Sequence, residues 1–219
     1  MTFDWSVIWQ KRDLFLAGIL ITIELTVITM LLAVPIGLVL MAMRRSRSKL
    51  LRALSLAYVE TFRNIPLILL LFWLFYVLPT LLDVQIPPFT TAILGLVLII
   101  SAYNAETFRA GVNSIRRGQG DAALALGMSS LQAMRIVILP QAVRRVLPIL
   151  ATTWVSLFKD TSLVSVIAVS ELSYVGLEIR SATFRILEVL TALAALYWCL
   201  GYPQAKLVDW MHRRYGAVE

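Results

Sequence analysis

Four consecutive polar residues interrupt an otherwise apolar stretch of the chain: Lys159, Asp160, Thr161 and Ser162. A lysine can bind a carboxylate, an aspartate can bind an ammonium, and the hydroxyls can donate or accept hydrogen bonds, so this set suits a zwitterion such as an amino acid. The two charges can equally neutralise each other or pair with another segment, which would give the run a structural or gating role. Four neighbours cannot share one helix face, so we expect the helix to break here or to border a cavity.

A second polar group, made of Glu60, Arg63 and Asn64, lies in another apolar stretch and is followed by Pro66. Glu60 and Arg63 are three residues apart and share a helix face, where we expect them to pair. Pro66 has no amide hydrogen and removes a backbone hydrogen bond nearby. This group fits a salt bridge that fixes helix packing as well as it fits a place on a substrate path.

Three further residues in apolar stretches favour packing over chemistry. Glu106 lies three residues before Arg109, which predicts a surface ion pair. Cys199 is the only cysteine, so we expect it to pack within the last apolar stretch and to form no disulfide within the chain. Glu24 has no partner close in sequence and faces either a subunit interface or a cavity.

The composition excludes an ordinary soluble protein. Hydrophobic residues make up 59% of the 219 residues and charged residues 15%, against about 45–50% and about 25% in soluble domains. Five apolar stretches are long enough for the about 20 residues of a bilayer-crossing helix, namely 14–43, 54–82, 89–108, 146–169 and 186–205. Backbone groups in lipid must be hydrogen-bonded internally, so such stretches predict helices. We expect one all-α transmembrane domain over residues 1–219, with five spans.

The positive charge follows the predicted crossings. Fourteen basic residues fall on one side: Arg44, Arg45, Arg47, Lys49, Arg52, Arg109, Arg116, Arg117, Arg135, Arg144, Arg145, Lys206, Arg213 and Arg214. Five fall on the other side: Lys11, Arg12, Lys159, Arg180 and Arg185. Basic residues near span ends concentrate in the cytoplasm, so we expect the N-terminus outside and the C-terminus inside. The net charge of +7 is then explained by the membrane topology and not by nucleic-acid binding. The N-terminus reads Met-Thr-Phe-Asp-Trp, with Asp4 and no basic residue among these five, so we expect no cleaved signal peptide.

The longest polar segment of the chain contains start and stop signals for short helices. Asp121 is a good helix N-cap, and Gly127 suits the left-handed position that follows a helix. Ser129 and Gln132 form a capping-box pattern that begins a second helix, which should end or bend before Pro140. The sequence therefore predicts two short helices set at an angle. Such an element could receive force from a second protein, or it could only float among the lipid headgroups.

This segment resembles the EAA loop of the permeases of binding-protein-dependent ATP-binding-cassette importers. The pattern of that loop is E-A-A, three residues, G, nine residues, I, one residue and L-P. The chain keeps the spacing within residues 113–140, where Asp121 replaces the glutamate and Val137 replaces the isoleucine. The matching residues are Asp121, Ala122, Ala123, Gly127, Leu139 and Pro140.

The chain also resembles the polar amino-acid branch of that family, over roughly residues 100–172 and more weakly over 60–66. It looks somewhat closer to permeases for glutamate and aspartate than to those for arginine or histidine. The resemblance implies the architecture of a type I importer permease, in which the helix near 121–135 docks on a cytoplasmic ATPase. It also implies a homodimer or heterodimer with a related permease, two ATP-binding subunits and an external substrate-binding protein in a bacterial inner membrane. The partner ATPase would hold ATP and Mg²⁺, and this chain would hold no cofactor.

Other function classes fit the sequence less well. His212 is the only histidine and lies in the basic tail, so we expect neither a Ser–His pair nor a metal site at membrane depth, and no enzymatic activity. The phosphate-binding pattern G-x-x-x-x-G-K-[ST] is absent, so ATP must bind to a partner. The alternative is an ion-gradient-driven secondary amino-acid transporter or a channel that acts without an ATPase. Five spans with one polar break do not show the two-half repeat of many such carriers.

Overall fold

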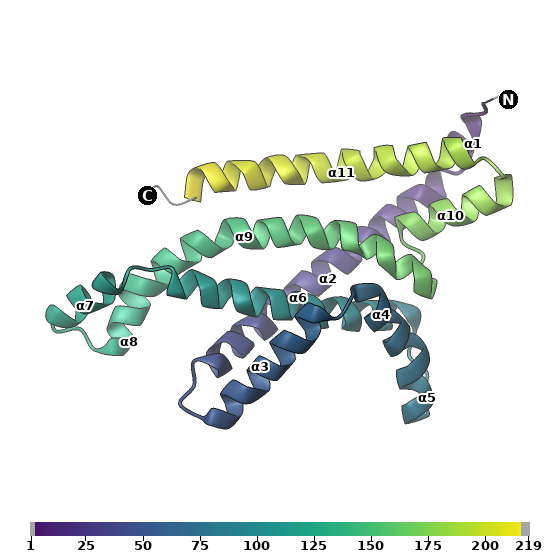
Figure 1. The fold of residues 1–219 in the computed structure, drawn as a ribbon. Coiled ribbons are helices and arrows are strands. Elements are labelled where there is room, and N and C mark those ends of the chain that lie inside the picture. Colours follow the sequence, from purple (N-terminus) through teal and green to yellow (C-terminus); the bar gives the residue numbers. More distant parts are fainter. Residues whose placement is uncertain (1–2, 216–219) are drawn as a thin grey trace.

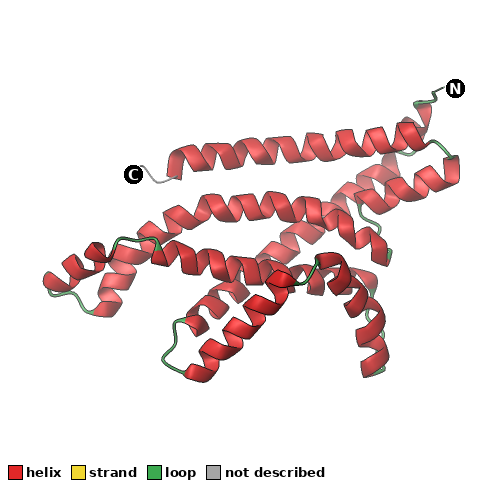
Figure 2. Cartoon of the chain, in the orientation of Figure 1, coloured by secondary structure: helices red, strands yellow, loops and turns green. Residues whose placement is uncertain are grey.

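The chain folds into helices that run between two ends of an elongated molecule. A computed structural model describes residues 3–215, and every regular element among these residues is a helix (Figure 2). The all-α fold class predicted from the apolar stretches is therefore confirmed.

Within the described part of the chain, four helical segments are long and apolar enough to cross a bilayer: α2 (Arg12–Arg44), α6 (Pro88–Asn113), the segment Ser130–Ile167 and α11 (Ile186–Tyr215). They overlap four of the predicted stretches, and each is longer than the stretch it overlaps. The segment Ser130–Ile167 has four parts, namely α8 (Ser130–Gln132), the π-helix η2 (Ala133–Ile138), α9 (Leu139–Asp160) and the 3-10 helix η3 (Thr161–Ile167).

The predicted span 54–82 is not one straight helix. It divides into α3 (Lys49–Asn64) and a segment made of α4 (Leu67–Phe72), the π-helix η1 (Trp73–Val77) and α5 (Leu78–Leu82). The helix axis bends by 105° between the two halves. Ile65, which precedes Pro66, adopts an extended backbone with ψ 128°, as expected where a proline ring excludes the helical conformation of the residue before it. Residues 3–215 thus contain four candidate spans, or five if this bent pair counts as one.

Three shorter helices lie between or before the spans: α1 (Ser6–Gln10), α7 (Arg117–Ala125) and α10 (Leu172–Thr183). The sequence analysis placed no helix at α10. Ala168, in a left-handed conformation with φ 59°, separates η3 from the loop that leads into α10.

The centre of the molecule is the contact between α2 and α6. Gly37 lets the two backbones approach, because a Cβ atom on this glycine would lie 2.8 Å from Cβ of Asn104 and 3.1 Å from the backbone nitrogen of Ala105. The α9–η3 segment packs against the same core. The buried residues of this core include Leu25, Ala33, Leu96, Ile100, Leu157, Val164 and Ile167.

The connecting segments gather at two ends. The α2–α3 turn, α7, α8 and the end of α11 lie at one end, whereas α1 and the α10–α11 turn lie at the other (Figure 1). The segments that the sequence analysis assigned to one side of the membrane therefore share one end of the molecule.

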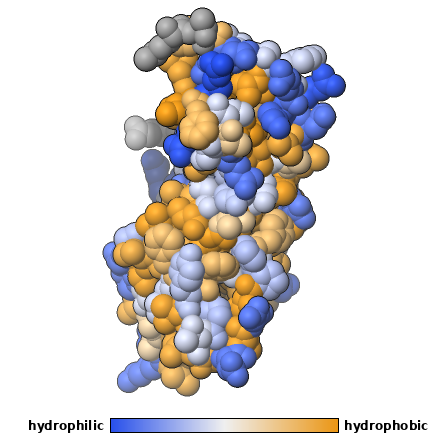
Figure 3. Space-filling model, turned by 90° about the vertical axis from the view of Figure 1, so that its right-hand side faces the viewer, coloured by the Kyte–Doolittle hydropathy of each residue, from blue (hydrophilic) through white to orange (hydrophobic). Residues whose placement is uncertain are grey.

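Apolar side chains also cover much of the surface, where orange residues stand beside blue ones (Figure 3). Cys199 is among the exposed residues, so the prediction that it packs inside the chain is wrong. The reason is that α11 buries only one stripe, which includes Val189 and Leu193, and Cys199 lies off that stripe.

Candidate substrate cavity and coupling segment

A cavity of about 330 Å³ lies where the two interrupted helices approach α6. Its wall comes from the α3–α4 bend, from α6 and from the junction of α9 with η3. The lining residues are Arg63, Asn64, Ile65, Pro66, Leu67, Leu96, Ile99, Ile100, Tyr103, Asp160 and Leu163. Of the seven residues that the sequence analysis assigned to a substrate path, the cavity brings together Arg63, Asn64 and Asp160. Glu60, Lys159, Thr161 and Ser162 do not line it.

The side chain of Arg63 packs against α6 and not along its own helix, α3. Its guanidinium carbon lies 5.8 Å from the centre of the Tyr103 ring, and the Tyr103 hydroxyl donates to the Arg63 carbonyl at 3.5 Å. Among the described residues, no ion pair joins Arg63 to Glu60, which is exposed, so the predicted pair is wrong. The face of the Tyr103 ring attracts the guanidinium of Arg63 instead. Nε of Arg63 is buried without a hydrogen-bond partner, and Arg63 is one of the residues that line the cavity.

Asn64 ends α3 just before the bend. Its Nδ2 donates to the carbonyl of Glu60 at 2.6 Å, a backbone acceptor left free at the end of a helix. The side-chain oxygen of Asn64 keeps its acceptor capacity beside the cavity.

The predicted irregularity near residue 160 is present. The α-helical winding ends at Asp160 and tightens to a 3-10 helix from Thr161. Asp160 is half-buried at the cavity wall, and Lys159 is exposed. Thr161 is fully buried and donates to the carbonyl of Phe158 at 2.8 Å, so it serves the helix and not the cavity. Ser162 is half-buried and lies outside the lining.

The cavity thus offers one cation, one anion, one amide and one phenol within a largely apolar wall. That set can bind a small molecule with both a carboxylate and an ammonium group. Among the described residues, no group of three or more His, Cys, Asp or Glu side chains is placed to hold a metal ion.

Tyr103 is a site residue that the sequence analysis missed. Its only signal was its place in a polar run with Asn104 and Glu106 on an apolar helix. Glu106 itself pairs with Arg109, as predicted. Glu24 is exposed on α2 and takes no part in the cavity.

At the opposite end from the N-terminus, α7 forms a short exposed helix. It begins at Arg117, so Asp121 lies in its middle and the predicted N-cap role of Asp121 is wrong. The helix starts earlier because Arg116, with ψ 132°, is the last residue before the helix that has a non-helical backbone, and Arg117 is the first helical residue. The helix includes Gly118 and Gly120 despite their low helix propensity, and Gln119 is tied to Gln141 of α9 by a 3.2 Å hydrogen bond.

The end of α7 follows the prediction closely. Gly127 has φ 81°, in the left-handed region. The amide of Gly127 donates to the carbonyl of Leu124, and the amide of Met128 donates to that of Ala123, which is the Schellman arrangement. Ser129 and Gln132 form the predicted capping box, with hydrogen bonds of 3.3 and 2.8 Å.

The predicted second short helix is wrong: of the two outcomes expected before Pro140, an end or a bend, the helix that starts at Ser130 shows no end there. It continues for 38 residues, to Ile167. The π-helical turn η2 precedes Leu139 and Pro140 and widens the winding there. A proline ring clashes with the carbonyl four residues earlier in an α-helix, and a π-bulge relieves this contact.

Of the coupling residues identified by their resemblance to the EAA loop, some are exposed and one is buried. Asp121 and Ala122 on α7 are exposed, as are Leu139 and Pro140 on the long helix, whereas Ala123 is buried against that helix. Leu124 in α7 and Leu126 at its end are also exposed, and Leu126 is 80% exposed. An exposed face of this kind, on an element tied to a membrane-crossing helix, suits contact with another protein.

Crossing helices that are interrupted around a shared cavity with four polar side chains in its wall, and a short exposed helix at one end, are typical of a membrane transport subunit. Over residues 33–216 the sequence matches the family described as "Binding-protein-dependent transport system inner membrane component", and the chain belongs to this family. The resemblance noted on the EAA loop is thereby confirmed.

Relatives align over nearly the full chain. The glutamine transport system permease protein GlnP of Escherichia coli (strain K12) is 37% identical over 215 residues, which cover 98% of each chain. The glutamate/aspartate import permease protein GltK of Escherichia coli O157:H7 is 34% identical over 222 residues, 97% of this chain and 98% of the relative. The L-cystine transport system permease protein TcyB of Bacillus subtilis (strain 168) is 34% identical over 212 residues, 96% of this chain and 90% of the relative.

Solved structures share the fold. A chain in the crystal structure of an amino acid ABC transporter with histidines superposes with a TM-score of 0.93 at 33% identity, over 98% of this chain and 100% of that chain. A chain of the MetNI methionine ABC transporter in an inward-facing conformation gives a TM-score of 0.68 at 21% identity, over 92% and 98%, and shows the fold alone.

Proposed function

We propose that this chain is the permease subunit of an ATP-driven importer that moves a polar amino acid across the inner membrane. The observation that carries the proposal is that two interrupted helices, at Pro66 and at Asp160, border one polar cavity. Interrupted helices are typical of substrate sites in membrane transporters. The relatives named for glutamine, glutamate/aspartate and cystine transport support polar amino acids as the substrate class.

The lining suggests how an amino acid would bind. The guanidinium of Arg63, with its unpartnered Nε, would receive the carboxylate, and the carboxylate of Asp160 would receive the ammonium. Asn64 and Tyr103 would supply further hydrogen bonds to the substrate. The cation of this scheme is Arg63, since Lys159 does not line the cavity. Relatives of similar identity are named for the transport of different amino acids, so an acidic amino acid is one choice among several.

Transport would be driven from the α7 end. In this proposal α7 docks in a cleft of a cytoplasmic ATPase, which binds ATP and Mg²⁺, and the residues Asp121, Ala122, Ala123, Gly127, Leu139 and Pro140 form or support the contact. Because α7 is fixed to the helix Ser130–Ile167, a push on α7 would move the helix whose far end borders the cavity at Asp160. Alternating access by rocking of rigid units follows.

A complete importer would contain more chains. We propose two permeases, either two copies of this chain or this chain with a related one, together with two ATP-binding subunits and an external binding protein. The charge distribution supports an external N-terminus and a cytoplasmic C-terminus.

The test is transport by the reconstituted assembly. Proteoliposomes that contain the permease, its ATPase and its binding protein would be loaded with ATP and offered each of the twenty amino acids. We expect uptake of a polar amino acid that stops when ATP is replaced by a non-hydrolysable analogue. Uptake by the permease alone, driven by a sodium or proton gradient, would contradict the proposal and support the secondary transporter.

A further inference from the structure

The short helix α1 and the residue that precedes it expose two tryptophans at the edge of the membrane-crossing region. Trp5 and Trp9 are four residues apart, one helical turn, and Trp9 is 71% exposed. Val7, on another face of α1, is buried in a cluster with Phe15, Leu172 and Val189. The protein therefore holds α1 in place by one face while the indole rings remain outside the core.

Chain connectivity places these rings at the boundary of the bilayer. Lys11 alone separates α1 from the span α2, whose first turns expose Leu14, Leu16 and Leu20. The exposed tryptophans thus continue the apolar surface with which α2 meets lipid. Indole rings have an apolar body and a polar N–H, and tryptophan is enriched at the interface between lipid tails and water.

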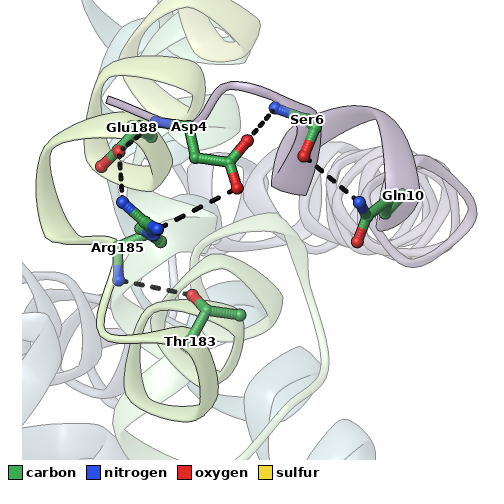
Figure 4. A network of polar contacts seen from close by, with 6 residues as sticks. All are labelled: Asp4, Ser6, Gln10, Thr183, Arg185 and Glu188. Atoms are coloured by element: carbon green, nitrogen blue, oxygen red, sulfur yellow. Dashed lines mark hydrogen bonds and ion pairs between the residues drawn. The ribbon is translucent and has the colours of Figure 1, made fainter. Parts of the chain in front are cut away.

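A polar clamp fixes the N-terminal segment to the start of α11 (Figure 4). The backbone amide of Asp4 donates to Oε1 of Glu188 at 3.0 Å. Arg185 lies 3.6 Å from Glu188 and 4.0 Å from the Asp4 carboxylate. Hydrogen bonds from Ser6 lower the pKa of Asp4 below its ordinary value. The clamp ties α1 to the α10–α11 turn.

That turn presents a third aromatic ring. Phe184 is 85% exposed and adopts a left-handed backbone with φ 58°. This conformation costs an L-residue about 1–2 kcal/mol relative to the right-handed one, and glycine would avoid the cost. The amide of Phe184 donates to the carbonyl of Arg180 at 2.9 Å, which holds the turn. The fold thus keeps a large apolar ring outside the core at the same end of the molecule as α1.

From these contacts we infer that Trp5, Trp9 and Phe184 form an aromatic anchor that inserts among the lipid headgroups at the N-terminal end of the molecule. The anchor uses aromatic rings and not net charge, because Asp4, Asp13 and Glu188 offset the basic residues beside them: Arg12 pairs with Asp13, and Arg185 pairs with Glu188. It therefore fits zwitterionic lipid as well as anionic lipid. The clamp sets the depth of the anchor relative to α11.

Spin-label accessibility in nanodiscs tests the anchor in the full-length chain. With Cys199→Ser as background, a nitroxide would be attached at Trp9→Cys or at Gln10→Cys, its neighbour on a different face of α1. A nitroxide on the native Cys199, 13 residues into α11, calibrates a position about 20 Å along the span. Collision with dissolved oxygen reports lipid, and collision with a nickel chelate reports water.

We expect the label at position 9 to be several-fold less accessible to nickel than the label at position 10, and shallower than the label at Cys199. Equal nickel accessibility at positions 9 and 10 would place α1 in water and overturn the inference. A position 9 label shielded from both reagents would show that protein covers this face, and would overturn it too. Trp5→Cys repeats the measurement on the same face if Trp9→Cys does not fold.

Lipid composition tests the cause. Nanodiscs of phosphatidylcholine alone and nanodiscs with added phosphatidylglycerol should give the same depth at position 9. Insertion only with the anionic lipid would show that charge and not the aromatic rings drives it, against the inference. Neither result depends on ATP or substrate, so the outcome is separate from that of the proposed transport function.

Discussion

The hydroxyl of Tyr197 on α11 donates a 2.9 Å hydrogen bond to Oε2 of Glu171, a fully buried carboxylate at the start of α10. The same carboxylate accepts from the amides of Ser173 and Tyr174. The amide of Leu172, next to Glu171, donates to Thr22 of α2 at 3.1 Å. A buried carboxylate needs such donors to offset its lost hydration. This one joins α10 to α11, and the neighbouring amide of Leu172 joins α10 to α2.

Tyr197→Phe should destabilise the folded permease. The substitution removes one donor from Glu171 and leaves a buried acceptor short of a partner, which costs about 1–3 kcal/mol. The thermal unfolding temperature of the purified protein in detergent would measure this. Tyr202→Phe on the exposed part of α11 is the matched control and should change little. Equal unfolding temperatures for the two variants would show that the hydrogen bond contributes nothing.

Gly37→Ala should loosen the contact between α2 and α6. The added Cβ would meet Cβ of Asn104 at 2.8 Å and backbone atoms of α6 at 3.1 Å, and backbone cannot rotate away. Overpacking of this kind costs about 1–3 kcal/mol. Gly201→Ala is the control, since nothing lies within 4 Å of its Cβ. We expect lower yield and a lower unfolding temperature for the first variant only, and the idea fails if both behave alike.

Asp160→Asn should weaken amino-acid uptake without unfolding the protein. The change keeps the shape of a side chain at the cavity wall and removes the charge proposed to meet the substrate ammonium. Loss of a charged hydrogen bond, about 1.5–3 kcal/mol, corresponds to roughly a tenfold or larger rise in the substrate concentration for half-maximal uptake. Asp209→Asn, at an exposed carboxylate paired with Lys206, is the control.

The same assay identifies the cation. If Arg63 binds the carboxylate, Arg63→Gln should impair uptake more than Lys159→Gln. The reverse order would mean that Lys159 reaches the substrate in another conformation, and the assignment to Arg63 would then be wrong.

Features that depend on local chemistry could be predicted from the sequence. The left-handed Gly127 and the capping box of Ser129 and Gln132 follow from residue types within one or two turns. The pair formed by Glu106 and Arg109 needs only the helical period. Length and apolar content sufficed for the long helices.

Features that depend on distant segments could not be predicted in this way. Arg63 turns to Tyr103, forty positions away in sequence, instead of to Glu60 on its own helix. The bend of 105° at Pro66 depends on what the following segment packs against, since a proline fixes only the local break. The Glu171 network joins three helices, and its bond between Leu172 and Thr22 spans 150 positions.

The most direct test of coupling through α7 is the number of amino acids transported per ATP hydrolysed when Gly127→Leu is compared with Gly118→Leu. Nothing lies within 4 Å of a Cβ at either position, but only Gly127 has a positive φ, so only the first leucine distorts the end of α7. We predict that Gly127→Leu hydrolyses ATP while its uptake per ATP falls severalfold, and that Gly118→Leu keeps most of the wild-type ratio. An unchanged ratio in Gly127→Leu would contradict the account.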